Sequence, residues 1–238
     1  MTVFGRPHLH LRSTGSTNDR ARELAEAGAP SGSVVTADEQ RAGRGRRGRA
    51  WSAPPGKALL FSAILRPLEL EHLLLPLSVP VAVCEAVEAL APVEARIKWP
   101  NDVWVAEAKV SGVLIEARPP DWAVIGIGIN LSNEPTEFPR DLRWPAASVG
   151  HGATVGAARE AVTAALGRWV EAPAERVLAE FRRRDALRGR EIGWEGAGVE
   201  PGSGIAAGVD DRGNLLAELA DGGSVALGSG EVSLRVRR

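Results

Sequence analysis

Cysteine and long apolar runs are nearly absent from this 238-residue sequence, and their absence excludes several classes of protein. The only cysteine, Cys84, has no partner in the chain, which excludes an intramolecular disulfide and a thiolate metal site. No run of about 18 apolar residues predicts a membrane span, and the start M-T-V-F-G-R-P-H-L-H lacks the apolar core of a signal peptide. The net charge of −1 argues against a surface devoted to nucleic acid. We therefore expect a cytoplasmic protein that binds neither DNA nor a membrane.

Lysine is scarce as well. Of 29 basic residues, three are lysine: Lys57, Lys98 and Lys109. Because an ammonium is a compact point charge and a guanidinium is a planar fork, the retained lysines are candidates for chemistry that arginine cannot perform. Chance survival of the three lysines is the alternative. The four histidines show no metal-ligand spacing, so we expect no metal held by protein side chains.

Apolar periodicity predicts alternating strands and helices followed by a short all-β region. Helices are expected from the capping residues 16–19 to Gly28, at 72–90 despite Pro76 and Pro80, at 156–169 and at 174–184; strands are expected at 8–12, 33–37, 58–65, 96–99, 103–106, 110–117 and 123–131. From Leu187 onward, short strands separated by Gly and Asp predict a separate module, with a boundary near residues 185–188.

The strongest local feature is R-A-G-R-G-R-R-G-R-A-W at 41–51, within a non-periodic segment at 39–56. Glycines let a backbone approach a ligand closely, and arginines offer forked donors for phosphate and carboxylate. A loop of this length inside a domain is usually functional or disordered. An RNA-binding Arg/Gly arm is the alternative, although the tract is short and lies between two predicted strands.

Two further motifs follow. K-W-P-N-D at 98–102 and K-V-S-G at 109–112 place two of the three lysines at the start of strands that a turn near Glu107-Ala108 would set side by side. Solvated lysines at strand ends are the alternative. G-I-G-I-N at 126–130 is not a dinucleotide fingerprint, because the third glycine and the following helix are missing. By itself it could mark only a bulge or close backbone packing.

In this order, the motifs resemble the biotin protein ligase family from about residue 9 to the C-terminus. The resemblance rests on G-S-T-N at 15–18, Gln40, G-R-G-R-R-G-R-A-W at 43–51, the two lysine motifs, G-I-G-I-N, and C-terminal segments near 204–216 and 229–235. It implies an α+β fold: a mixed β-sheet catalytic domain with helices (1–186), of the class II aminoacyl-tRNA synthetase and biotin ligase type, and a small SH3-like β-barrel (187–238). Because the first motif begins at residue 15, we expect the single-function class without an N-terminal DNA-binding domain.

The resemblance implies a two-step reaction: biotin and ATP form biotinyl-5′-AMP and pyrophosphate, and a carrier lysine then takes the biotin. Lys109 would bridge the biotin carboxylate and the α-phosphate, with Arg44 and Arg46 beside them, and Mg²⁺ would screen the β- and γ-phosphates. Asp102 would help deprotonate the acceptor lysine. The loop 39–56 would close over the labile adenylate.

The resemblance also implies two sets of ligand contacts. The biotin set is Ser16, Thr17, Asn18, Gln40, Gly43, Arg44, Gly45, Arg46, Lys109, Gly112, Gly126 and Gly128, in which the hydroxyls and amides hold the ureido group and the last three glycines make room for the rings. The ATP set is Arg46, Arg47, Arg49, Trp51, Lys98, Asn101, Asp102 and Asn130.

The partner implied by the resemblance is a biotin carboxyl carrier protein, and a homodimer is possible. The nearest alternative is a lipoate-protein ligase, which shares the fold superfamily and the adenylation chemistry. The arginine-rich loop and the C-terminal module favour biotin.

Overall fold

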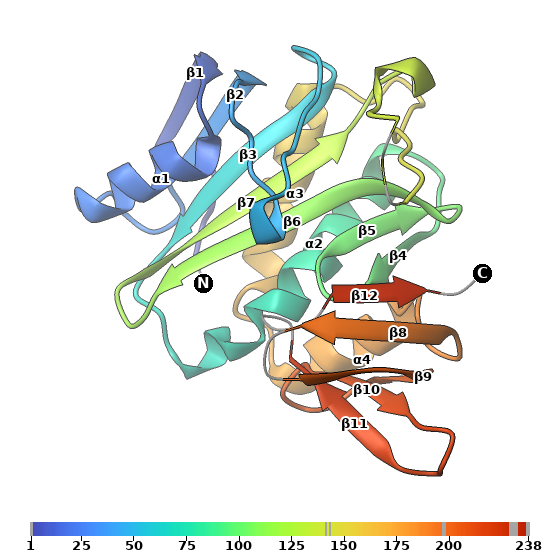
Figure 1. Cartoon of the computed structure of the whole chain (residues 1–238). Coiled ribbons are helices and arrows are strands. Elements are labelled where there is room, and N and C mark those ends of the chain that lie inside the picture. The colour runs from blue at the N-terminus through green and yellow to red at the C-terminus, as the bar shows by residue number, and fades with distance from the viewer. Residues whose placement is uncertain (1, 141, 143, 197–198, 229–232, 237–238) are drawn as a thin grey trace.

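The computed structural model describes residues 2–140, 142, 144–196, 199–228 and 233–236, which form two β-sheets and four α-helices (Figure 1). The larger sheet has the strand order β1-β2-β3-β7-β6-β5-β4; β1 and β2 run parallel, and the other neighbouring strands are antiparallel. The mixed sheet expected from the sequence is therefore confirmed. Its strands are β1 (His8–Thr14), β2 (Val34–Gln40), β3 (Ala58–Leu65), β4 (Ala95–Lys98), β5 (Asp102–Val105), β6 (Ala108–Arg118) and β7 (Trp122–Asn130).

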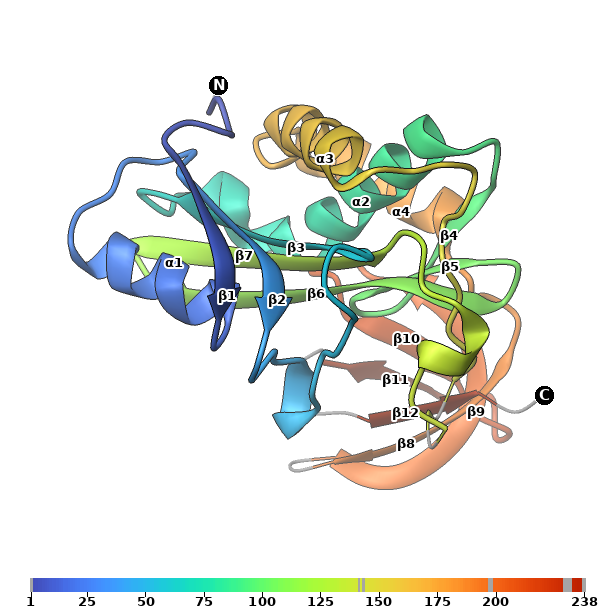
Figure 2. The same cartoon turned by 90° about the horizontal axis from the view of Figure 1, so that it is seen from above.

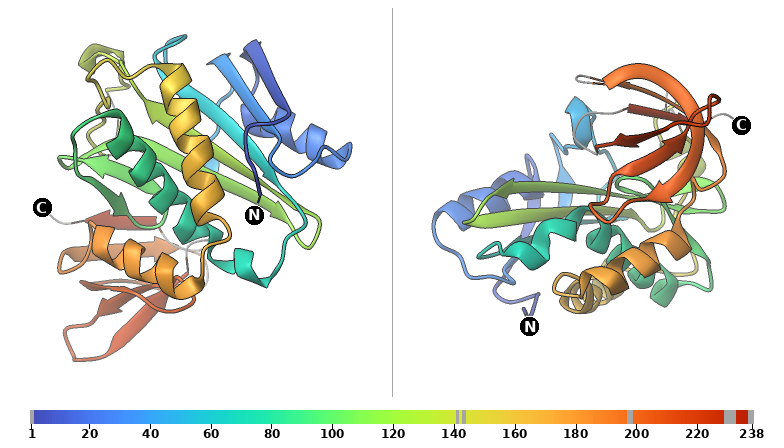
Figure 3. Two further views of the ribbon diagram at one scale, coloured as in Figure 1. Left: turned by 180° about the vertical axis from the view of Figure 1, so that it is seen from behind. Right: turned by 90° about the horizontal axis from the view of Figure 1, so that it is seen from below.

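The helices cover the two faces of this sheet unequally. The helices α2 (Leu75–Leu90), α3 (Val155–Trp169) and α4 (Ala174–Arg184) lie on one side, and α1 (Thr17–Glu26) packs on the other (Figures 2 and 3). Successive strand residues point to opposite faces, so a central strand must be apolar throughout. All eight residues of β3 are buried, Ala63 in the cluster under α2 and Ile64 in the cluster under α1.

Helix α1 begins and ends where the sequence predicted, but the predicted side-chain cap is missing. Ser16 occupies the N-cap position, and its side chain makes no capping hydrogen bond. Thr17 and Asn18 are buried instead of capping the helix. The helix stops before Gly28, whose φ of 86° suits a residue without a Cβ.

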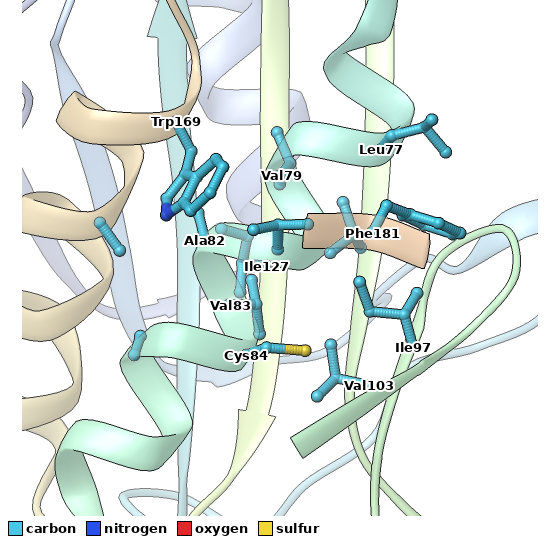
Figure 4. Packing of buried hydrophobic residues seen from close by; sticks show 14 of the residues in the cluster. Leu77, Val79, Ala82, Val83, Cys84, Ile97, Val103, Ile127, Trp169 and Phe181 are labelled. Atoms are coloured by element: carbon cyan, nitrogen blue, oxygen red, sulfur yellow. The ribbon is translucent and has the colours of Figure 1, made fainter. Parts of the chain in front are cut away.

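Helix α2 is the apolar centre of the fold (Figure 4). Pro76 stands in its first turn, where a missing N–H costs nothing, and a 3₁₀ turn, η2 (Leu70–Leu74), precedes it. Pro80 is tolerated inside the helix. By length and composition, Leu70–Leu90 could cross a membrane, with a mean hydropathy of 1.8. Because 61% of that window is buried within the protein, core packing accounts for its apolar character.

The C-terminal strands form a second, antiparallel sheet in the order β11-β10-β9-β8-β12. The long strand β9 curves strongly (Figure 3). Among the described residues β11 and β12 are the two edges, so the expected barrel is an open, curved sheet there. Residues 229–232 of the C-terminal motif lie outside the described residues. The strands are β8 (Glu191–Gly196), β9 (Val199–Val209), β10 (Leu215–Glu218), β11 (Ser224–Leu227) and β12 (Ser233–Val236).

This second sheet packs against the first. Buried residues of both sheets belong to one continuous apolar cluster. The indole N–H of Trp99, in the K-W-P-N-D motif, donates a hydrogen bond to the Gly213 carbonyl at 3.1 Å. Arg182 of α4 pairs with Asp211 at 2.9 Å. The C-terminal sheet therefore supports the strand end that carries Lys98.

Candidate active site

A cavity of about 540 Å³ lies on the sheet face that carries α1, under the segment 41–51. It brings together all the predicted site residues except Gly43. Gly43 packs against the last residue of the same segment: a Cβ on Gly43 would come 2.3 Å from the Trp51 carbonyl oxygen. The predicted residues that line the cavity are Ser16, Thr17, Asn18, Gln40, Arg44, Gly45, Arg46, Arg47, Arg49, Trp51, Lys98, Asn101, Asp102, Lys109, Gly112, Gly126, Gly128 and Asn130.

Two lysines and one carboxylate form the cationic part of the cavity. Lys109 Nζ lies 2.6 Å from Asp102 Oδ1, and Lys98 Nζ lies 4.0 Å from Asp102 Oδ2. The sequence predicted that the two lysines lie on neighbouring strands, and this prediction is wrong. The turn at Ala106-Glu107, both with positive φ, joins β5 to β6, and β4 pairs with the far edge of β5. Asp102, the first residue of β5, therefore stands between the lysines.

An aromatic ring lies near each of the two ammonium groups. Lys109 Nζ is 5.6 Å from the centre of the Trp51 ring, and Lys98 Nζ is 5.4 Å from that of Trp144. Trp104 packs against Trp144 with ring centres 5.5 Å apart. A cation over an aromatic face is stabilised by the ring quadrupole, and this holds the lysine heads in the cavity wall.

The opposite end of the cavity is built for neutral hydrogen bonding. Gln40 Oε1 accepts from the Thr17 backbone N–H at 2.7 Å and from the Thr17 hydroxyl at 2.9 Å. This fixes the Gln40 amide, so its Nε2 is left as a donor. Among the described residues, neither Gln40 Nε2 nor the Ser16 hydroxyl has a hydrogen-bond partner, and both side chains line the cavity. Ser62, fully buried on β3, lies 2.8 Å from the Thr17 hydroxyl.

The asparagines of the K-W-P-N-D and G-I-G-I-N motifs are engaged by the protein. Asn101 Nδ2 donates to the Val113 carbonyl at 2.9 Å, while its Oδ1 accepts from Arg46 at 3.1 Å. Asn130 Nδ2 donates to the Ala147 carbonyl at 3.1 Å. Asn101 and Asn130 therefore brace the cavity wall, and Asn101 also holds the loop.

The segment 41–51 is folded over the cavity. A β-bridge joins Arg44 to Ala50, with a 3₁₀ turn, η1 (Arg46–Gly48), between them. Burial, then the adjacent Arg47, lower the pKa of the Arg46 guanidinium. Arg44 reaches outward and pairs with Asp19 at 2.8 Å and Glu116 at 2.9 Å. All four arginines at 44, 46, 47 and 49 line the cavity; Arg44 pairs with two carboxylates, whereas the Asn101 amide oxygen accepts from Arg46.

Glycines make room for Trp51 and Asn18. A Cβ on Gly128 would come 2.4 Å from the Trp51 indole, and one on Gly112 would come 3.2 Å from it. At Gly126 a Cβ would lie 2.1 Å from Asn18 Oδ1. The close approach required at these glycines is therefore to protein side chains in this structure.

Sequence reasoning missed three polar or aromatic residues and an apolar wall. Ser62 could have been found as the one hydroxyl in an otherwise apolar strand. Glu116 and Trp144 carried no local signal. The apolar wall, which suits a ligand with an aliphatic chain, consists of Leu60, Phe61, Val113, Leu114, Ile127, Phe138 and Leu142.

Comparison with known proteins agrees with this geometry. Residues 11–130 match the biotin/lipoate A/B protein ligase family, and residues 198–235 match the biotin protein ligase C-terminal domain. The chain is 32% identical to the bifunctional ligase/repressor BirA of Bacillus subtilis over 92% of its own length and 72% of that protein. It is 31% identical to the biotin–[acetyl-CoA-carboxylase] ligase of Mycobacterium tuberculosis, over 93% and 86% of the two chains.

A solved structure of a biotin protein ligase from Aquifex aeolicus, in complex with biotin and ATP, superposes with a TM-score of 0.79 at 29% identity. The match covers 98% of this chain and 100% of that one. The fold and the cavity define an acyl-activating protein ligase of the biotin/lipoate class. The chain belongs to the biotin protein ligase family.

Proposed function

We propose that the chain joins biotin to the AMP part of ATP, which gives biotinyl-5′-AMP and pyrophosphate, and then transfers the biotin to a lysine of a carrier protein. One observation carries this assignment: a single cavity has a neutral hydrogen-bonding end, an apolar wall and a cationic end. These three parts match the ureido group, the valeryl chain and the carboxylate of biotin, in that order.

The first step brings two anions together, and the cationic end serves that step. A biotin carboxylate oxygen attacks the α-phosphorus, and the bond from that phosphorus to the pyrophosphate oxygen breaks. Two unit negative charges 4 Å apart repel by about 4 kcal/mol at an effective dielectric constant of 20. Lys109 meets both anions, Arg46 stands beside them, and Arg47 and Arg49 face the remaining phosphates. In the proposed pose Trp51 lies along the ligand, and Lys98 supports the nucleotide.

Recognition of the ureido group is assigned to Ser16 and Gln40, whose hydroxyl and Nε2 have no hydrogen-bond partner among the described residues. Thr17 acts mainly through Gln40, because its hydroxyl and backbone N–H are both directed at Gln40 Oε1. Gly45 lets the loop backbone approach the ligand, and Gly43 lets the loop pack closely against the Trp51 carbonyl.

In this proposal Mg²⁺ enters the cavity bound to the phosphates of ATP. Among the described residues that line the cavity, Asp102 is the one carboxylate, and Lys109 already neutralises it. In the part of the chain that the structure describes, no group of three metal-ligating side chains is assembled. The phosphates therefore supply the Mg²⁺ ligands, with water completing the shell, and the ion screens their charge.

In the second step the acceptor amine attacks the acyl carbon and AMP leaves. A lysine with its ordinary pKa is a poor nucleophile at neutral pH, so a proton must be removed. We assign this role to Asp102, which the departure of Lys109 toward the phosphate would release from its 2.6 Å ion pair.

The acceptor is proposed to be a biotin carboxyl carrier protein of acetyl-CoA carboxylase, in keeping with the names of the relatives. We propose that the enzyme acts in the cytoplasm, as a monomer or homodimer. The proposed domain division at 186/187 falls between α4 and β8.

The test is ATP–pyrophosphate exchange, run separately with biotin and with lipoate, followed by transfer to a purified carrier domain and detection with streptavidin. We expect exchange with biotin only. Exchange with lipoate only would identify a lipoate ligase, and exchange with neither acid would refute adenylation. The RNA-binding alternative is disfavoured because Arg44 and Arg46 are bonded to the folded domain.

A further inference from the structure

Asn18 has no free donor for a ligand. The residue is 4% exposed. Its Nδ2 donates to Glu116 Oε2 at 2.7 Å and to the Leu114 carbonyl at 3.3 Å, and its Oδ1 accepts from Ser62 at 2.6 Å. A primary amide has two N–H donors, and both are used. Asn18 therefore ties α1 to β3 and β6, and it has no N–H left to donate to a ligand.

Glu116 lies at the centre of this network. Its Oε2 accepts from Asn18 and also from Arg44 at 2.9 Å, and its Oε1 accepts from Arg44 at 3.0 Å. One carboxylate, 25% exposed, thus holds a residue of the vitamin end and a residue of the Arg/Gly segment. These residues are 98 and 72 positions away from Glu116 along the chain.

The charges around Arg44 are balanced within the protein. Asp19, next to Asn18 on α1, pairs with Arg44 at 2.8 Å and with Arg22 at 3.0 Å. Arg22 also lies 4.0 Å from Glu116. Two carboxylates and two guanidinium groups form a closed set. Arg44 is therefore engaged by protein carboxylates on both sides.

We propose that Glu116 is a positioning residue for biotin: it aligns residues 16–18 through Asn18 and fixes the closed form of the 41–51 segment through Arg44. This rests on the proposed function. The ureido-binding groups are then placed at the same time as the segment closes. The same contact brings Trp51 against Gly112 and Gly128. Arg44 acts in closure and not as a phosphate ligand.

Glu116→Gln separates the two arms of the network. A glutamine oxygen in the place of Oε2 can still accept from Asn18 and from Arg44. The NH₂ group in the place of Oε1 cannot accept and is left facing the guanidinium, and the negative charge that paired with Arg44 is lost. We expect KM for biotin in the exchange assay to rise roughly tenfold, because a charge-assisted hydrogen bond is lost from a partly exposed site. KM for ATP at saturating biotin should stay within about twofold. The melting temperature should change little, because the remaining contacts of Asn18 persist.

A second measurement does not depend on activity. Tryptic cleavage between Arg41 and Arg49 in the free enzyme should be faster in Glu116→Gln than in wild type. The matched control is Glu107→Gln, which also removes a carboxylate from an arginine pair (Arg190, 2.6 Å) but whose described side-chain hydrogen bonds do not involve residues 16–18 or 41–51. It should leave both KM values and the cleavage rate unchanged.

The two sides of the contact should act as one unit. Arg44→Gln should reproduce the rise in biotin KM, and the double variant should be no worse than the more affected single variant. Glu116→Asp, which keeps the charge, should restore part of the affinity and serves as the second variant if Glu116→Gln fails to fold.

An unchanged biotin KM in a folded Glu116→Gln enzyme, or additive effects in the double variant, would refute the positioning role while leaving biotin activation intact. Equal losses for biotin and ATP would make Glu116 a structural residue only. Absence of exchange in wild type would instead overturn the proposed function, and with it this inference.

Discussion

Replacement of Lys109 by alanine should slow biotinyl-AMP formation far more than it destabilises the protein. In wild type, Lys98, Lys109 and Asp102 together carry a net charge of +1 where the two anions meet. Without Lys109 the net charge is zero, and the Asp102 carboxylate is left exposed to the incoming carboxylate and phosphate. Loss of a donor aimed at developing charge costs about 2.7–4 kcal/mol, so the exchange rate should fall by about 100- to 1,000-fold.

The chain offers a close control for this variant. Lys57 Nζ lies 2.6 Å from Glu137 Oε1, the same distance as Lys109 from Asp102, and the two lysine side chains are 35% and 27% exposed. Lys57 does not line the cavity. Lys57→Ala therefore removes a comparable ion pair and should leave the exchange rate close to that of wild type.

The assay is single-turnover formation of biotinyl-AMP at saturating substrates, with melting temperature measured on each variant. Lys109→Arg should recover only part of the rate, because a planar fork does not reproduce a point charge. Equal rates for Lys109→Ala and Lys57→Ala would refute the role of Lys109. A full rescue by arginine would show that any cation suffices there.

Three other outcomes are expected. Thr17→Val should raise KM for biotin and leave that for ATP nearly unchanged, since it frees Gln40 and costs roughly 1–3 kcal/mol; parallel losses for both ligands would assign Thr17 to the fold. Trypsin should cut the free enzyme first within 41–49, and biotin with ATP should suppress that cut; equal rates would refute the lid. Burial raises the pKa of Glu88, but the hydrogen bonds from Arg184 and the Ala95 N–H and the charges of Arg184 and Arg183 together outweigh it. The net shift of the pKa is downward, so the stabilisation that Glu88 gives is present at neutral pH and lost as pH falls through the folded-state pKa. Melting temperature against pH should therefore fall less steeply in acid for Glu88→Gln, and identical slopes would refute that linkage.

The elements of the fold were predictable where short-range pattern determines them. β3 is apolar over eight consecutive residues because it is buried on both faces, and that is readable as a run. The end of α1 at Gly28 follows from one backbone angle. The order of the strands was not readable, so the two lysines were placed on adjacent strands when β5 in fact separates them.

The site was predictable as a set of residues and less so as a set of roles. The motifs identified which residues gather, and all but Gly43 line one cavity. A role depends on which donors are already used, and that is set by contacts between distant segments. The family resemblance assigned the ureido group to Asn18, but Asn18 is engaged by Ser62 on β3 and Glu116 on β6, neither of which belongs to a motif.

The same reasoning divides the arginines of the 41–51 segment. The arginine side chains of the segment are chemically alike, and their spacing in the sequence cannot distinguish them. Arg44 meets two carboxylates and is neutralised there, whereas Arg46 is turned inward and Asn101, a neutral group, accepts from it. Arg44, Arg46, Arg47 and Arg49 all line the cavity, and among them Arg44 is paired with Asp19 and Glu116. The ion pairs of Arg44 with Asp19 and Glu116 therefore hold the segment in place over the cavity.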